Sequence, residues 1–101
     1  MIEFHLEAAR DYERARRWYA DRSLPAAVEF DRQFDRALER MSAAPESFSL
    51  LDDRFRTISI RDFPYQIIYC MEGAADRLFV VAVAHTRRRP GYWSDRSREI
   101  E

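Results

Sequence analysis

The residues best suited to chemistry lie together near the end of the sequence. An apolar run at 78–84 stops at His85, arginines fill 87–89, and two aromatics follow at 92–93 beyond a proline–glycine pair. Imidazole can act as a general acid or base near neutral pH. Guanidinium groups bind phosphate or carboxylate through paired hydrogen bonds. The segment therefore predicts either a site for the phosphate backbone of a nucleic acid or a surface that grips an acidic protein.

Each of these residues also has a purely structural interpretation. A histidine at a strand end can hydrogen-bond the backbone and fix the turn that follows. An arginine run can stay solvated and discourage edge pairing, and no more than two of Arg87, Arg88 and Arg89 can point the same way along a strand. Tyr92 and Trp93 more often pack down to anchor a tail than stack on a base. The residue types leave both interpretations open.

Composition narrows the class of protein. A chain of 101 residues predicts one domain, residues 1–101. All 17 cationic residues are arginine, so no lysine can serve as a base and every cationic contact uses a guanidinium fork. Residues 1–84 hold 12 arginines against 15 acidic residues, whereas residues 85–101 hold 5 against 3. The positive charge is concentrated in the same segment as His85.

Several other kinds of site are disfavoured. The only cysteine, Cys70, lies in an apolar run, which predicts a buried core residue and no intramolecular disulfide. Two distant histidines and that cysteine do not make a zinc site, and two glycines do not make a phosphate loop. We expect no metal and no cofactor. The sequence shows no secretory signal and no apolar run long enough to span a membrane, which predicts a cytoplasmic protein without membrane contact.

Hydrophobic periodicity predicts a short strand at residues 2–5 and then two helices. The first helix is expected over about 6–21, and the second begins near Pro25, which suits a first helical turn, and ends near Ser42. The short link between them predicts an antiparallel hairpin. The apolar stripes that define the helices are Ala8, Tyr12, Ala15 and Tyr19 in the first, and Ala27, Phe30, Phe34, Ala37, Leu38 and Met41 in the second.

The second half of the chain predicts strands. Residues 43–53 are expected to form a loop, and alternation at 54–61 indicates a strand that ends at the bend Phe63-Pro64-Tyr65. Apolar runs at 67–71 and 78–84 indicate two more strands, the last covered on both faces. These three form an antiparallel meander with the helical hairpin on one face, which is an α+β arrangement.

The predicted meander brings distant residues together. If the turn around Ala74 pairs Met71 with Arg77, counting outward places His85 opposite Phe63. Arg54 and Arg56 then begin their strand at the far end of the sheet. The residues expected to converge on the other end are Arg61, Tyr65, His85 and Arg87.

The chain resembles the RelE/ParE superfamily of bacterial type II toxins over nearly its whole length. Two elements carry the resemblance in order and spacing: Phe63-Pro64-Tyr65 with Tyr69 following, and His85-x-Arg87-Arg88-x-Pro90 with Tyr92-Trp93 following. The N-terminal strand with its alanine-rich helix and Arg56 add to it. The resemblance implies a toxin made beside an antitoxin that neutralises it, as in plasmid stabilisation systems.

The resemblance leaves the target open. ParE-like members inhibit DNA gyrase by binding it, and the pattern is slightly closer to theirs. RelE-like members cut mRNA on the ribosome, and a third alternative is an interaction module without toxicity. A nuclease would use His85 as base or acid, Arg61, Arg87 and Arg88 on the phosphate, and Tyr65 or Tyr92 to orient the substrate. The absence of lysine departs from many RelE-like sites. We expect the antitoxin to cover the sheet end and the helical groove; homodimerisation stays open.

Overall fold

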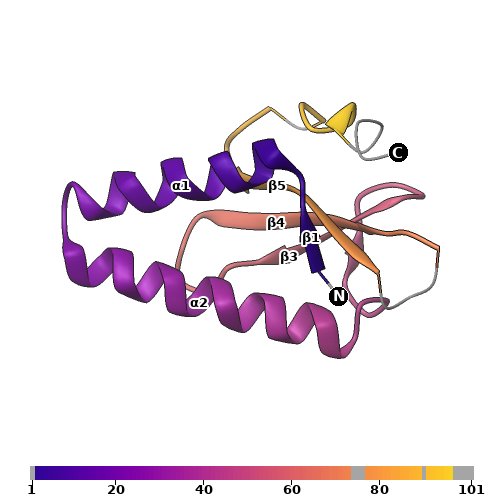
Figure 1. The fold of residues 1–101 in the computed structure, drawn as a ribbon, viewed down its shortest axis with the longest axis horizontal. Helices are drawn as coiled ribbons and strands as arrows, with labels where there is room; N and C mark the ends of the chain where they lie inside the picture. The colour runs from indigo at the N-terminus through magenta and orange to yellow at the C-terminus, as the bar shows by residue number, and fades with distance from the viewer. Residues whose placement is uncertain (1, 74–76, 90, 97–101) are drawn as a thin grey trace.

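A computed structural model describes residues 2–73, 77–89 and 91–96. The two predicted helices are present and form the predicted antiparallel hairpin (Figure 1). The connection between them spans only residues 21–23. In chain order the elements are β1 (Ile2–Phe4), α1 (Leu6–Ala20), α2 (Leu24–Ala43), β2 (Ser49–Leu50), β3 (Phe55–Ser59), β4 (Tyr65–Met71) and β5 (Leu78–His85).

Both helices begin at a residue whose side chain caps the free backbone N–H groups. His5 Nδ1 accepts a hydrogen bond from the Glu7 N–H at 3.0 Å, so this imidazole ends β1 and starts α1. Ser23 Oγ accepts from the Ala26 N–H at 3.3 Å at the start of α2. These two capping hydrogen bonds fix the residue at which each helix begins.

The sheet has five strands in the order β1-β5-β4-β3-β2, with the predicted antiparallel meander β3-β4-β5 at its centre. Two further strands extend this meander, one on each side, and the sequence predicted neither pairing. β1 lies parallel to β5, with Ile2 beside Leu78. The segment 43–53, expected to be a loop, contributes β2, which pairs with β3 through Ser49 and Leu50. The fold class remains α+β with a mixed sheet.

The pairing of β4 with β5 differs from the predicted register. Met71 lies beside Leu78, and Tyr65, instead of Phe63, lies beside His85. Two one-residue shifts produce the second difference. Met71 lies beside Leu78 instead of Arg77, and Ile68 pairs with Ala82 whereas Tyr69 pairs with Val80, which leaves Val81 as an extra residue. The predicted turn around Ala74 and the residue Pro90 lie outside the described residues.

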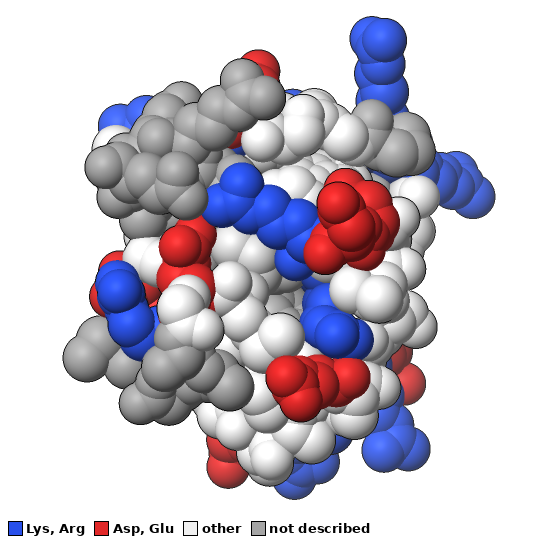
Figure 2. Space-filling model, turned by 90° about the vertical axis from the view of Figure 1, so that its right-hand side faces the viewer, with Lys and Arg blue, Asp and Glu red and all other residues white. Residues whose placement is uncertain are grey.

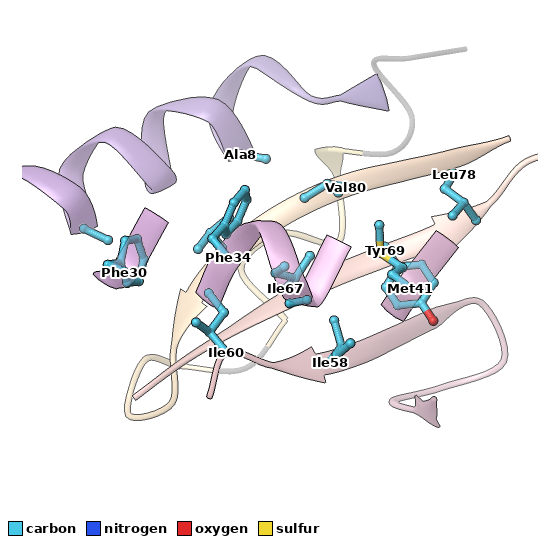
Figure 3. Packing of buried hydrophobic residues seen from close by; sticks show 13 residues of the cluster. Ala8, Phe30, Phe34, Met41, Ile58, Ile60, Ile67, Tyr69, Leu78 and Val80 are labelled. Atoms are coloured by element: carbon cyan, nitrogen blue, oxygen red, sulfur yellow. The ribbon is translucent and has the colours of Figure 1, made fainter. Parts of the chain in front are cut away.

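Buried side chains form one layer between the helices and the sheet. Figure 3 shows Phe30, Phe34 and Met41 of α2 lying against Ile67 and other side chains of the strands. A second buried cluster occupies the opposite face of the sheet and includes Trp93. β5 is therefore buried along both faces, as predicted for a central strand, and Cys70 of β4 is buried as predicted. The second cluster comprises Phe55, Ile68, Cys70, Phe79, Val81, Ala82, Ala84 and Trp93.

Neither helix in the described part of the chain is long and apolar enough to cross a membrane.

Candidate functional site

His85 ends β5 and is held in place from two directions. Its ring packs edge-on against Tyr65 of β4, with the ring centroids 5.1 Å apart. Its Nδ1 accepts a hydrogen bond from the Arg87 backbone N–H at 3.0 Å, and its carbonyl oxygen accepts one from the Arg88 N–H at 2.9 Å. The imidazole thus fixes the turn that carries the arginine run, which is the structural role considered for it from the sequence.

The hydrogen bond at Nδ1 decides which chemistry His85 offers. A neutral imidazole has one N–H and one lone pair. Because Nδ1 accepts from the backbone, the lone pair is in use there and the proton lies on Nε2. In this conformation the free edge of His85 is a hydrogen-bond donor, and it has no lone pair to take a proton from a substrate hydroxyl.

Tyr65 joins His85 to the aromatic core. Its ring contacts Tyr19 of α1 and Phe30 of α2, with centroids 6.3 Å and 5.6 Å away. Burial raises the pKa of the Tyr65 hydroxyl above its ordinary value. Tyr65 therefore positions His85 against the helical hairpin, and the predicted proximity of these two residues is confirmed.

A hollow of about 230 Å³ opens beside His85, between α1 and the end of the sheet. An adjoining hollow of about 180 Å³ shares Trp18, Tyr65 and His85 with it. Trp18 is 50% exposed at this border, so part of its ring is open to solvent. The first hollow is lined by Asp11, Arg14, Ala15, Trp18, Tyr65, Val83, His85 and Arg88.

The arginine run divides by position. Arg88 lines the hollow, and its guanidinium lies 3.7 Å above the Tyr92 ring. Arg87 and Arg89 are exposed at the turn. Burial raises the pKa of the Tyr92 hydroxyl, which is buried and has no hydrogen-bond partner among the described residues. The Tyr92 ring thus packs against the Arg88 guanidinium at the edge of the hollow.

Trp93, the other predicted binding aromatic, is only 6% exposed. It belongs to the second core cluster, on the face of the sheet that the helices leave uncovered. Trp93 therefore anchors the segment 91–96 and offers little surface to a ligand, as in the packing interpretation.

Arg61 does not join this group. It lines a separate hollow of about 350 Å³ together with α2 residues. The register explains the difference: Tyr65 is the residue opposite His85, and the Ile60 N–H donates to the Tyr65 carbonyl to close the bend. Arg61 therefore lies on the connecting loop at the same end of the sheet as His85, as predicted, but it lines a different hollow.

Arg54 and Arg56 have structural partners at the other end of the sheet. Arg54 forms an ion pair with Glu72 at 3.2 Å. Arg56 Nη1 donates to the carbonyls of Glu46 and Phe48 at 3.0 Å and 2.8 Å, which ties the segment before β2 to β3. Figure 2 views the end where α2 finishes and β5 begins, and positive and negative side chains are intermixed on it.

The sequence prediction missed Asp11, a buried acidic residue of α1. Its carboxylate accepts hydrogen bonds from the Val83 N–H at 3.2 Å, from Arg96 Nη1 at 2.7 Å and from Arg14 Nη2 at 2.6 Å. Arg96 also donates to the Val81 carbonyl, at the irregularity in β5. Asp11 therefore links α1, β5 and the C-terminal segment and orients Arg14 beside the hollow. The signal was available, since Asp11 interrupts the apolar stripe between Ala8 and Ala15.

A helical hairpin packed on a mixed sheet agrees with the fold that the RelE/ParE resemblance implies. The chain belongs to the family described as the ParE toxin of the type II toxin–antitoxin system parDE, whose model matches residues 2–90. The sequence-based prediction of a ParE-like type II toxin is thereby confirmed.

One solved structure similar to this chain is described as the chromosomal ParDE TA system from P. aeruginosa. The TM-score is 0.69 over 83% of this chain and 92% of that chain, at 12% sequence identity, so the likeness is one of fold. No curated protein matches the chain in sequence.

Proposed function

We propose that this ParE-family toxin acts by binding a protein target, DNA gyrase, in the cytoplasm, through the hollow beside His85. The observation that carries the proposal is the hydrogen bond from the Arg87 N–H to His85 Nδ1. This hydrogen bond uses the lone pair of His85 to hold a turn, whereas a histidine that acts as the base in RNA cleavage needs a free lone pair.

The composition of the hollow supports a protein contact. Trp18 presents a half-exposed ring, and Arg14 and Arg88 bring guanidinium groups to the same opening. Tryptophan, tyrosine and arginine are the residues most enriched at the energetic centres of protein interfaces. The choice of gyrase among protein targets comes from the resemblance to ParE-like members.

The placement of Arg61 further disfavours the nuclease alternative. Stabilising the charge that develops on a phosphate requires cationic groups gathered around one point. Arg61 lines a different hollow from His85, and Arg87 is exposed at the turn. The set of residues assigned to phosphate chemistry from the sequence is therefore divided between two places.

We infer that a cognate antitoxin neutralises the toxin by covering this same hollow. An amphipathic helix laid against α1 would place apolar side chains against Trp18, and acidic side chains would meet Arg14 and Arg88. Binding should then weaken as salt rises, because exposed charges are screened beyond about 8–10 Å at ordinary ionic strength.

The proposal is tested with purified toxin in a gyrase supercoiling assay. Trp18→Ala should raise the inhibitory concentration at least about 30-fold, the equivalent of a hot-spot loss of about 2 kcal/mol. Leu50→Ala, a change at a comparably exposed residue of β2, should leave it unchanged.

A second arm tests the nuclease alternative on translating ribosomes. His85→Asn supplies an oxygen acceptor near the place of Nδ1 and removes the imidazole, so gyrase inhibition should survive this change. Cleavage of mRNA by the parent toxin that disappears in His85→Asn, without inhibition of gyrase, would refute the proposal.

A further inference from the structure

Seven arginines of the described residues pair with a carboxylate, and Arg61 is not among them. Within the described ranges, Arg61 and Arg36 form no ion pair, and Arg40 reaches only the Ser59 carbonyl at 3.4 Å. By contrast, the arginines that pair with carboxylates are Arg10, Arg14, Arg16, Arg32, Arg54, Arg77 and Arg96.

These three arginines surround one hollow of about 350 Å³ between α2 and the loop after β3. Arg36 and Arg40 are one helical turn apart on α2, where like charges repel each other, and Arg61 adds a third from the loop. Glu39 is the single carboxylate in the lining. The hollow thus holds an excess of positive charge that a bound anion would relieve.

We infer that Arg36, Arg40 and Arg61 form a second site, which takes a backbone phosphate of a nucleic acid. Guanidinium forks match phosphate oxygens in pairs and keep their charge at any physiological pH. This site is separate from the hollow beside His85 and does not depend on the proposed target.

The residues that line this hollow favour a nucleic acid over an acidic protein as its ligand. The described residues around this hollow are Gln33, Arg36, Glu39, Arg40 and Arg61, all of them polar. A protein partner would need apolar contacts at the centre of its interface, and such contacts are offered beside His85 by Trp18 and Tyr65 instead. A phosphodiester backbone needs charge alone.

The site is tested by fluorescence anisotropy with a short labelled DNA duplex at about 50 mM salt. Each phosphate contact contributes close to 0.9 to the slope of log K against log salt, which corresponds to roughly tenfold in affinity at that salt concentration. The double variant Arg36→Gln/Arg61→Gln should therefore bind about 100-fold more weakly, with a slope lower by about 2. Arg40 is left in place because it also holds the Ser59 carbonyl.

Two further variants make the experiment specific. Arg17→Gln removes one positive charge from an exposed position in the last turn of α1 and should weaken binding less than twofold, against about tenfold for each charge removed from the hollow. Glu39→Gln removes the carboxylate from the hollow and should tighten binding severalfold. A single-stranded RNA probe should rank the variants in the same order of affinity, since the group that is recognised is the phosphate.

Three results would overturn the inference: no binding by the parent protein, equal weakening by Arg17→Gln, or competition by polyglutamate as strong as that by nucleic acid at equal charge. The melting temperature of each variant is measured to show that lost binding is not caused by misfolding. An unchanged melting temperature in the double variant, together with lost binding, supports the site.

Discussion

Replacing Asp11 with asparagine removes a negative charge on which two arginines and a backbone N–H converge. The Asp11 side chain is 2% exposed and that of Arg96 is 12% exposed, so the pair is shielded from water. An asparagine oxygen can accept from only part of this set, and its NH₂ group would face a donor. Asp11→Asn therefore leaves the Arg96 charge buried without its counter-charge.

The size of the effect follows from this burial. Removing one partner of a buried ion pair costs about 3–5 kcal/mol. Arg96 keeps its bond to the Val81 carbonyl at 2.9 Å and its place 5.0 Å from the Tyr92 ring, so we expect the lower end of the range. A loss of about 3 kcal/mol in the free energy of unfolding corresponds to a melting temperature lower by at least ~12 °C for a domain of this size.

Urea denaturation followed by circular dichroism measures this loss. The matched control is Arg14→Gln, which removes the partner whose side chain is 59% exposed and should cost less than about 1 kcal/mol. The double variant Asp11→Asn/Arg96→Met should be more stable than the sum of the single changes by about 1–3 kcal/mol. A cost below about 1 kcal/mol for Asp11→Asn would show that this carboxylate does not hold the C-terminal segment.

Three further changes test other parts of the fold. Burial and a hydrogen bond to Asp31 raise the pKa of Tyr12 far above its ordinary value of 10.0. The contribution of Tyr12 to the free energy of unfolding should therefore be complete below pH ~10 and fall as pH rises beyond it, because the unfolded chain releases the proton first. Tyr12→Phe should flatten that fall in urea titrations at several pH values. Tyr69→Phe removes the 2.7 Å bond to the Pro45 carbonyl and should cost about 1–2 kcal/mol in thermal melts. Asp62 has φ 70°, so Asp62→Gly should melt higher than Asp62→Ala by the equivalent of about 1 kcal/mol, and equal melting would contradict a strained backbone there.

The helices and the central strand could be predicted because their signals are local. The apolar stripe of α2 repeats along its own length, and the uninterrupted run 78–84 requires cover on both faces. The parallel pairing of β1 with β5 could not be predicted in this way. It places Ile2 beside Leu78, and neither segment carries a sequence pattern that predicts which strand lies next to it.

The site was predicted only in part for a related reason. One extra residue in β5, Val81, adds to the one-residue shift already present at Met71, and together the two shifts place Tyr65 beside His85 while Arg61 lies beyond the strand end. At this irregularity Arg96, from the segment 91–96, donates to the Val81 carbonyl, which is a long-range contact that local patterns do not predict. Trp18 lies on α1, but its part in the hollow depends on where β5 ends.

The strand order has a consequence for how the toxin is made. β5 is an interior strand and also the last of the five in chain order, with β1 on one side and β4 on the other. Contacts between residues so distant in sequence form slowly and late. While β5 is still being synthesised, β1, the helices and the β3-β4 hairpin lack the strand that joins them, and His85 and Arg88 do not yet exist. The hollow beside His85, which we propose as the binding surface, therefore forms only after β5 and the turn that follows it have been made, and a chain that stops before residue 85 lacks this hollow.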